Sequence, residues 1–310
     1  MRIYVAGHRG LVGSAIVREI EKSSKHTWIG KSRTELDLLD RRAVFDYLRA
    51  EKPDAVIIAA AKVGGIMANN TFPVEFLSQN LQIETNLIDG SHEADIQKLL
   101  FLGSSCVYPK LSPQPIKEEY LLTGELESTN EAYALAKISG LKLVQAYRRQ
   151  HGRAWISAMP TNMYGPGDNF DENYAHVLPA LIHKFHSAKV NNEPQVTLWG
   201  SGNPRREFLH SSDLASACVY LLEEYDSDIA INIGTGKDIT ILELSRIVKD
   251  IVGYAGDIVW DKSRPDGTPR KLLDVTRIAA TGWKASVSLE DGIRETYLWF
   301  LGQGEASAKP

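Results

Sequence analysis

The sequence predicts an α/β protein built on a doubly wound parallel sheet, followed by a smaller α/β domain. Its first half alternates short apolar runs with helical patterns, which is typical of βαβ units. A glycine-rich loop follows the first apolar run, and the regular alternation fades after Pro160. The 310 residues are enough for a Rossmann-type sheet and a second domain.

The expected elements alternate in type along the chain. We expect strands at 3–6, 27–30, 55–60, 98–102 and 155–159, and helices at 11–23, 41–51, 74–89 and 130–151. Residues 1–160 are predicted to form the Rossmann domain, to which segments near 206–235 and 274–282 return. Residues 161–310 are predicted to form mainly the second domain.

Composition restricts the classes of partner. The chain is 43% hydrophobic and 24% charged with a formal net charge of -4, so we expect neither a nucleic-acid surface nor a membrane-surface helix. Its two cysteines, Cys106 and Cys218, are far apart and lack metal-ligand spacing, which argues against a disulfide scaffold and a zinc site. No segment is apolar for long enough to span a bilayer. We therefore expect a soluble cytoplasmic protein without a bound metal.

A GxxGxxG loop follows the first predicted strand and opens the first helix. Gly7, Gly10 and Gly13 are its glycines, and Leu11 and Val12 begin the helix. Backbone N–H groups at such a place bind pyrophosphate, and a β-carbon would block the close approach of the phosphate oxygens. The alternative is a plain strand-to-helix turn. The position of the loop favours a dinucleotide site.

Two arginines predict which dinucleotide is bound. NAD sites usually carry a carboxylate at the end of the second strand, but this sequence has Arg33 there and Arg9 inside the glycine loop. Guanidinium groups bind a 2′-phosphate well, so we expect NADP(H) rather than NAD(H). The alternative is that both arginines are simply solvated.

A tyrosine and a lysine four residues apart indicate proton chemistry. Tyr133 and Lys137 lie on one face of the predicted helix, whose start at 128–131 reads as a capping box. The ammonium group is expected to lower the pKa of the phenol, which could then exchange a proton with a carbonyl oxygen. Ser104, at the end of an apolar strand, could donate a hydrogen bond to the same oxygen.

Together these motifs resemble the extended short-chain dehydrogenases that act on nucleotide sugars, and the resemblance covers nearly the whole chain. Asn162-Met163-Tyr164-Gly165-Pro166 and Arg206-Glu207-Phe208-Leu209-His210 add to it. Within that family, the segments 59–66, 69–71, 103–110 and 265–275 are similar to the GDP-L-fucose synthases.

The resemblance implies a two-step reaction on GDP-4-keto-6-deoxy-D-mannose. Cys106 and His176 would invert C3 and C5 as base and acid, and NADPH would then reduce C4 while Tyr133 protonates the oxygen. On residue type alone, such a cysteine is often only a small buried residue, and such a histidine is often structural. Cys218 is expected to be a core residue.

The same resemblance implies further contacts of the Rossmann domain and of a substrate-binding second domain. Besides the residues named above, the expected cofactor contacts are Asp37, Ala59, Ala61, Tyr133, Lys137, Pro160, Asn162 and His176. The expected substrate contacts are Ser104, Ser105, Cys106, Asn162, Val177, Lys184, Trp199, Arg206 and Lys271. Lys184 stands where related synthases carry Arg, which leaves one phosphate contact open.

Two other functions share these motifs. A nucleotide-sugar 4-epimerase or 4,6-dehydratase keeps NAD bound, but Ser105-Cys106 lacks the acid pair of a dehydratase. A catalytically silent NADP-sensing protein would not need Ser104, Tyr133 and Lys137 together. Small residues on the Tyr133 helix also suggest close packing against a second copy in a homodimer. They are Ala132, Ala134, Ala136, Ser139 and Gly140.

Overall fold

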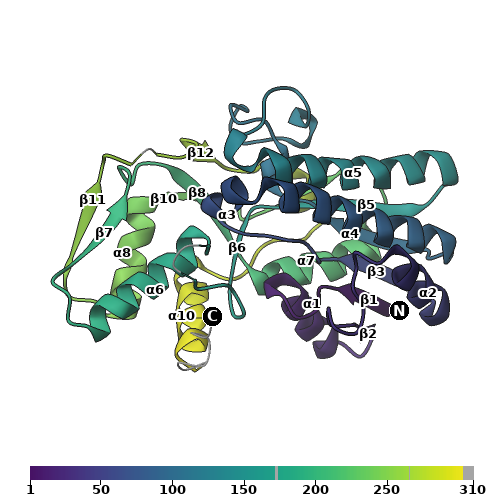
Figure 1. Cartoon of the computed structure of the whole chain (residues 1–310), viewed down its shortest axis with the longest axis horizontal. Coiled ribbons are helices and arrows are strands. Elements are labelled where there is room, and N and C mark those ends of the chain that lie inside the picture. The colour runs from purple at the N-terminus through teal and green to yellow at the C-terminus, as the bar shows by residue number, and fades with distance from the viewer. Residues whose placement is uncertain (172–173, 265, 303–310) are drawn as a thin grey trace.

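The computed structural model describes residues 1–171, 174–264 and 266–302, and its main element is a six-stranded sheet (Figure 1). The sheet has the order β2-β1-β3-β4-β5-β9, and all neighbouring strands are parallel. These strands are β1 (Arg2–Ala6), β2 (Thr27–Ile29), β3 (Ala55–Ile58), β4 (Lys98–Leu102), β5 (Ala154–Pro160) and β9 (Ile231–Ile233). After β2 the chain returns past β1 to form β3, so the carboxyl ends of β1 and β3 make a topological switch point. The predicted Rossmann-type fold is confirmed.

Successive residues of each strand enter opposite cores. In β1, Ile3 and Val5 pack into one hydrophobic cluster, whereas Tyr4 and Ala6 pack into the other. The strands are therefore apolar on both faces, as expected for a parallel sheet covered on both sides. This double burial explains why the strands appear in the sequence as continuous apolar runs.

Helices cover both faces of the sheet (Figure 1). One face carries α1 (Leu11–Lys22), α7 (Ser211–Glu224) and the short α9 (Thr276–Ala280). The other carries α2 (Arg41–Glu51), α4 (Pro73–Glu93) and α5 (Glu131–His151). Helices α4 and α5 pack directly on each other. Between these elements lie α3 (Ile66–Thr71) and three short 3-10 helices, η1 (Ser105–Val107), η2 (Glu118–Tyr120) and η3 (Ser128–Asn130).

The later part of the chain builds a third core beside the sheet, seen to the left in Figure 1. Its strands are β6 (Asn162–Tyr164), β7 (Gln195–Trp199), β8 (Arg205–His210), β10 (Asp238–Thr240), β11 (Asp257–Asp261) and β12 (Arg270–Lys271). They form two small sheets, β10-β8-β12 with β6 beside β8, and β11-β7. Helices α6 (Val177–Val190), α8 (Ile241–Val252) and α10 (Leu289–Gly302) cover them and enclose residues such as Phe185 and Leu244.

Two later segments lie against the first sheet. Strand β9 pairs with β5, and α7 packs against α1. Cys218 on α7 is 0% exposed within this core, which confirms its expected structural place. Strand β8, which falls within the predicted return segment near 206–235, instead joins β10, β12 and β6.

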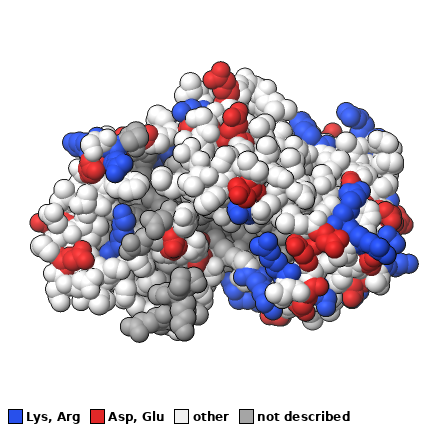
Figure 2. All heavy atoms as spheres, in the orientation of Figure 1, with Lys and Arg blue, Asp and Glu red and all other residues white. Residues whose placement is uncertain are grey.

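Acidic and basic side chains are interspersed over the face seen in Figure 2, so no field of one sign covers that face. None of the helices in the described chain combines the length and the apolar character that crossing a bilayer requires. The predicted motif residue Pro265 lies outside the described residues.

Candidate functional site

The glycine loop after β1 is built by close backbone contact. Gly7 has a φ of 87°, and a β-carbon there would lie 2.7 Å from the nitrogen of Ala60. A β-carbon at Gly13 would collide with the carbonyl oxygen of Gly7. A β-carbon at Gly10 would make only an ordinary van der Waals contact. The N–H group of Gly10 donates to the carbonyl oxygen of Gly7 at 3.0 Å. Two of the three glycines are thus required by space and conformation.

Helix α1 begins without a side-chain cap. Its N-cap residue is Gly10, and no side-chain hydrogen bond satisfies the first turn. The N–H groups of Leu11, Val12 and Gly13 therefore point from the helix end with the positive pole of the helix behind them. This is the geometry that binds a diphosphate.

The two arginines of the predicted phosphate clamp are exposed, Arg9 within this loop and Arg33 after β2. Within the described chain, neither Arg9 nor Arg33 forms an ion pair, so both guanidinium groups have free donors. Gly30 lets the second strand end directly against His8, because a β-carbon there would lie 2.6 Å from Nδ1. Asp37 is exposed and accepts a hydrogen bond from the N–H of Leu39 at 3.1 Å.

Tyr133 and Lys137 lie on α5 as the spacing predicts. The Nζ atom of Lys137 is 5.8 Å from the centre of the Tyr133 ring and 4.9 Å from that of Phe101. The edge of Phe76 packs against the phenol, with ring centres 6.3 Å apart. Lys137 also pairs with Glu84 of α4 at 3.0 Å, and both side chains are almost fully buried.

The predicted lowering of the Tyr133 pKa is wrong for this arrangement. Burial raises the pKa of Tyr133 well above its usual value near 10, and the anionic forms of Cys106 and Glu84 raise it further. Lys137 does not reverse this rise because its charge is balanced by the Glu84 carboxylate at 3.0 Å. The phenol is therefore a protonated group at neutral pH.

The predicted capping box before α5 is also wrong. Residues 128–130 form the 3-10 helix η3, and Asn130, the N-cap, makes no side-chain cap. Ser128 instead donates to the carboxylate of Glu127 at 3.5 Å. The 3-10 turn separates Ser128 from the first turn of α5, so the expected reciprocal bonds cannot form.

Ser104 and Cys106 meet at the end of β4. Their Oγ and Sγ atoms are 2.8 Å apart, and the Ser104 oxygen also accepts from the N–H of Cys106 at 3.4 Å. Ser105, between them, is buried. The short helix η1 thus turns the chain so that the first and third residues share one side. A hydroxyl in this place can donate either to the sulfur or to an oxygen bound beside it.

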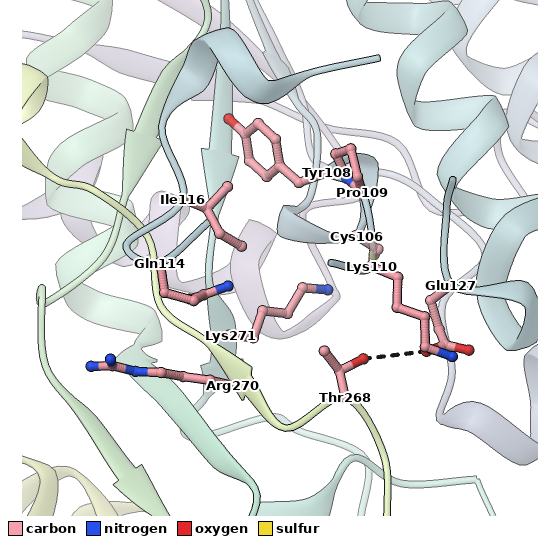
Figure 3. Close-up of a pocket in the computed structure, with 10 residues that line it drawn as sticks. All are labelled: Cys106, Tyr108, Pro109, Lys110, Gln114, Ile116, Glu127, Thr268, Arg270 and Lys271. Atoms are coloured by element: carbon pink, nitrogen blue, oxygen red, sulfur yellow. Dashed lines mark hydrogen bonds and ion pairs between the residues drawn. The ribbon is translucent and has the colours of Figure 1, made fainter. Parts of the chain in front are cut away.

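A pocket opens next to this pair (Figure 3). It is lined by Cys106, Tyr108, Pro109, Lys110, Gln114, Ile116, Glu127, Thr268, Arg270 and Lys271. Lys271 points from β12 toward Cys106, and the two interact electrostatically. At the opposite wall Glu127 pairs with Lys110 at 3.0 Å and accepts from Thr268 at 3.2 Å. Segments far apart in sequence therefore form one polar, mainly cationic pocket.

Arg206 stands behind Lys271. It donates to the carbonyl oxygens of Arg205 at 2.8 Å and Thr268 at 2.6 Å, which fixes the 266–271 segment to β8. Burial lowers the pKa of Arg206 and that of Lys271, and the two cations also disfavour each other. An anion bound between these two desolvated cations would reduce the repulsion between their charges.

Trp199 and Lys184 form a separate group at the end of β7. The Nζ atom of Lys184 lies 5.5 Å from the Trp199 ring centre, and Arg264 lies 5.2 Å from it. Trp199 is 58% exposed, and the turn after it is tied down by Ser201, whose hydroxyl donates to Asp266 at 2.6 Å. These residues do not line the pocket of Figure 3. They present a flat aromatic surface flanked by cations.

His176 is the N-cap of α6. Its side chain makes no cap, so the N–H groups of Val177 and Leu178 have no side-chain partner there, while Pro179 has no N–H group. The residue is exposed, yet the protein around its ring lowers the pKa of His176 by desolvation, so the ring is mainly neutral at pH 7. Helix α6 therefore offers a second helix N-terminus suited to an anion.

The segment before His176 makes two contacts with Gly65, the N-cap of α3. The N–H of Gly65 donates to Tyr174 at 2.9 Å, and a β-carbon at Gly65 would lie 2.8 Å from the oxygen of Ala175. The neighbouring Gly64 lies against Phe76, which touches Tyr133. A series of contacts through Gly65, Gly64 and Phe76 therefore links the segment before His176 to Tyr133.

The other predicted cofactor contacts lie at the carboxyl edge of the sheet. Ala59 and Ala61 follow β3, and Pro160 ends β5. Asn162 begins β6 and donates from its side chain to the carbonyl oxygen of Glu207 at 2.7 Å. Its amide is thus used at least in part to hold the two small strands together.

Two acidic residues escaped the sequence analysis. Glu84 contacts Lys137, and Glu127 forms one wall of the pocket. Helical periodicity contains a signal for the first, because Phe76, Asn80, Glu84 and Leu87 fall on one face of the predicted helix. A charged residue on that buried face needs a partner. Glu127 lies in a loop and carries no such signal.

The comparisons with known proteins agree with this architecture. A model of the NAD dependent epimerase/dehydratase family matches residues 3–234. GDP-L-fucose synthase 1 of Arabidopsis thaliana is 55% identical, covering 97% of this chain and 93% of its own length. The GDP-L-fucose synthase of Escherichia coli strain K12 is 53% identical, with 97% and 96% covered. A solved GDP-L-fucose synthetase from Naegleria fowleri bound to NADP has a TM-score of 0.91 at 30% identity, covering 99% of this chain and 96% of that chain.

The unequal exposure of the two thiols gives a first prediction. Iodoacetamide added to the native protein should alkylate Cys106, which is partly exposed, and spare Cys218, which is buried. Peptide mass spectrometry after short exposure measures both sites, and unfolding in guanidinium should make the two equal. Equal labelling of both thiols in the native protein would contradict the arrangement.

Proposed function

Because the chain belongs to the NAD dependent epimerase/dehydratase family, we propose that it makes GDP-L-fucose from GDP-4-keto-6-deoxy-D-mannose. The reaction would proceed by 3,5-epimerisation and then NADPH-dependent reduction at C4. Relatives of that name, 55% and 53% identical over 97% of the chain, support the substrate. The observation that carries the proposal is the contact of Ser104 with Cys106 at 2.8 Å, which puts a proton acceptor beside a ketone-binding hydroxyl.

The residues at the switch point fit a dinucleotide. The required glycines Gly7 and Gly13 and the uncapped start of α1 form a cradle that a β-carbon would fill. The unpaired Arg9 and Arg33 suit the additional phosphate of NADP(H). When bound, NADPH supplies the hydride that is transferred to C4.

Epimerisation needs removal and return of a proton beside the ketone. The C4 carbonyl acidifies the protons at C3 and C5, and the thiolate of Cys106 would take each in turn. Ser104 and Tyr133 would donate hydrogen bonds to the enolate oxygen, which carries the resulting charge. His176 would take up a proton from solvent, because its ring is mainly neutral at pH 7, and deliver it from the opposite face of the carbon. Each inversion leaves a thiol at Cys106 and a neutral imidazole at His176, so the thiol releases its proton to solvent and the imidazole takes up another before the second centre is inverted.

Reduction then needs a proton donor at the same oxygen. As the hydride reaches C4, the phenol of Tyr133 would give its proton to the developing alkoxide. A raised pKa favours this direction because the phenol remains protonated at neutral pH. The proposed epimerase and reductase steps thus use one ketone site.

The GDP diphosphate has suitable partners nearby. Arg206 and Lys271 are desolvated cations, and the N–H groups of Val177 and Leu178 open from α6. We assign the guanosine end to the surface formed by Trp199 and Lys184 on the basis of family resemblance and of its exposed aromatic face.

A direct assay tests the proposal and separates it from the alternatives. The protein incubated with GDP-4-keto-6-deoxy-D-mannose should consume one NADPH per GDP-L-fucose, measured by absorbance at the nicotinamide band and by product identification. A 4-epimerase or dehydratase that regenerates NAD would consume no NADPH, and a silent binding protein would form no product.

The role of Cys106 has its own isotope test. In deuterated water, the parent should incorporate deuterium at C3 and C5 of the sugar, whereas Cys106→Ser should lose this exchange by about a hundredfold or more, since a serine hydroxyl is a far weaker base. NMR of the recovered sugar measures exchange at each carbon. Cys218→Ser is the matched control and should exchange like the parent. Exchange at the parental rate in Cys106→Ser would exclude Cys106 as the base.

The phosphate clamp predicts a selective loss of cofactor affinity. Arg33→Ala should raise the dissociation constant for NADPH about tenfold, the equivalent of one charge-assisted contact, and leave that for NADH unchanged. Isothermal titration calorimetry measures both. Arg42→Ala, at an exposed arginine on α2, is the control. Equal weakening of NADPH and NADH would show that Arg33 does not read the 2′-phosphate.

Cytoplasmic location and a homodimer complete the proposal. Both cysteines are free thiols, which suits a reducing compartment. The dimer rests on family resemblance, because most of the small residues expected to contact a second copy are used inside the chain. Ala134, Ala136 and Gly140 are buried, and Gly140 faces Phe101 and Glu84.

A further inference from the structure

The backbone around Lys271 is fixed on two sides. Its short strand β12 pairs with β8, where Lys271 lies opposite Arg206. The next residue, Leu272, donates its N–H to the side chain of Gln114 at 2.9 Å, and its carbonyl oxygen accepts from the N–H of Ile116 at 2.8 Å. The base of the Lys271 side chain is therefore held between a strand of the second core and a loop of the first domain.

The ammonium group of Lys271 lies in the pocket that also contains Cys106 (Figure 3). The side chain points toward the thiol, and the ionised sulfur attracts the ammonium. Among the described residues, the Nζ atom of Lys271 forms neither a hydrogen bond nor an ion pair. Since a desolvated cation without a partner is unfavourable, an anion beside this ammonium would stabilise it.

The other charged side chains that line this pocket already have partners. Glu127 pairs with Lys110 at 3.0 Å across the pocket. Arg270 pairs with Asp238, which lies outside the pocket. Within the described lining, the groups left to balance each other are therefore the remaining ammonium and the thiol.

The hydroxyl of Ser104 gives the sulfur a second contact. Its Oγ atom is 2.8 Å from Sγ of Cys106. Once the thiol has lost its proton, only the hydroxyl can donate, so this contact becomes a hydrogen bond to an anion, which is stronger than one between neutral groups. A hydrogen-bond donor and a nearby cation are the surroundings in which protein thiolates are stabilised.

We infer that the ammonium of Lys271 is the counter-ion of the Cys106 thiolate and that it stabilises the ionised sulfur on which epimerisation depends. The inference rests on the proposed function for the use of Cys106 as the base, whereas the pairing itself belongs to the free protein. Lys271 would act on the sugar carbons through the sulfur, in addition to its proposed contact with the diphosphate.

The charged and titratable groups around Cys106 come from several elements. Tyr133 faces the thiol from α5, and Lys271 faces it from β12. Glu127 and Lys110 lie across the pocket as a pair, so their charges largely cancel. The remaining charged side chains of the region are Glu84, Lys137, Arg206 and Arg270. Removal of the Lys271 charge is therefore expected to change the stability of the thiolate directly.

The pH dependence of alkylation tests the pairing in the free protein. Iodoacetamide reacts with the thiolate, so its rate at Cys106 rises with pH and reaches a plateau once the thiol is ionised. In Lys271→Met the midpoint of this rise should move to higher pH by about one unit or more, because an opposite charge at short range favours ionisation by about that amount. Peptide mass spectrometry over a series of pH values measures the midpoint, which does not depend on how freely the reagent enters the pocket.

Two variants serve as controls for this shift. Lys271→Arg keeps the positive charge and should keep the midpoint close to that of the parent. Lys262→Met makes the same substitution at an exposed lysine outside the pocket, and it should leave the midpoint unchanged.

Hydrogen exchange at the sugar carries the inference to the reaction. In deuterated water with saturating GDP-4-keto-6-deoxy-D-mannose, Lys271→Met should incorporate deuterium at C3 and C5 about tenfold more slowly than the parent near neutral pH. The rate should recover as the pH rises, because the thiol then ionises without the ammonium. Loss of a diphosphate contact alone would raise the KM and leave the pH profile in place, and a damaged fold would lower the rate at every pH.

The outcomes separate this inference from the proposed function. If the parent neither exchanges nor forms product, the proposed function fails, and the alkylation midpoint still decides the pairing. A parental midpoint in Lys271→Met overturns the inference, whatever the activity of the parent. Should Lys271→Met not fold, Lys271→Gln takes its place, since it keeps a polar end without the charge, and a parental midpoint there overturns the inference equally.

Discussion

The arrangement of the site depends on the parallel alignment of the central strands. Because β1, β3, β4 and β5 all run in one direction, the residues that follow each strand meet at one edge. The glycine loop follows β1, Ala59 follows β3, and Ser104 follows β4. Helix α5 brings Tyr133 to this region, and strand β12 of the later part of the chain brings Lys271 toward Cys106. Residues from distant segments therefore meet at one place because the strands run in the same direction.

Charge balance is the second requirement of this edge. Several cations lie near this edge, and some of them are buried. Lys137 has its own carboxylate in Glu84, and Lys110 has Glu127. Arg206 and Lys271 lack a partner of that kind at comparable range among the described residues, and burial lowers the pKa of both. Lys137 and Lys110 are therefore paired with carboxyl groups, whereas Arg206 is held by backbone carbonyls and Lys271 faces the pocket.

Much of the fold was predictable because its signals are local. Continuous apolar runs, turn residues and the GxxGxxG spacing each depend on neighbours in the sequence, and the strands at 3–6 and 98–102 were found within a residue of their bounds. The spacing of Tyr133 and Lys137 also placed them on one helix face.

The surroundings of these two side chains could not be predicted from the sequence. The predicted lowering of the Tyr133 pKa failed because it counted Lys137 and could not count Glu84, which comes from another helix. Nothing local in the sequence shows, likewise, that Gly140 on α5 faces Glu84.

The contact of Gly7 with Ala60 couples the glycine loop to the middle of α4. Since no side chain separates these backbones, the turn after β1 packs directly on the loop after β3. That loop is held at Lys62 by Asn80, one helical turn from Glu84. A single length of main chain and one helix therefore connect the glycine loop to the Lys137 ammonium. The spacing between these two places is set by backbone geometry, which replacement of surface side chains leaves unaltered.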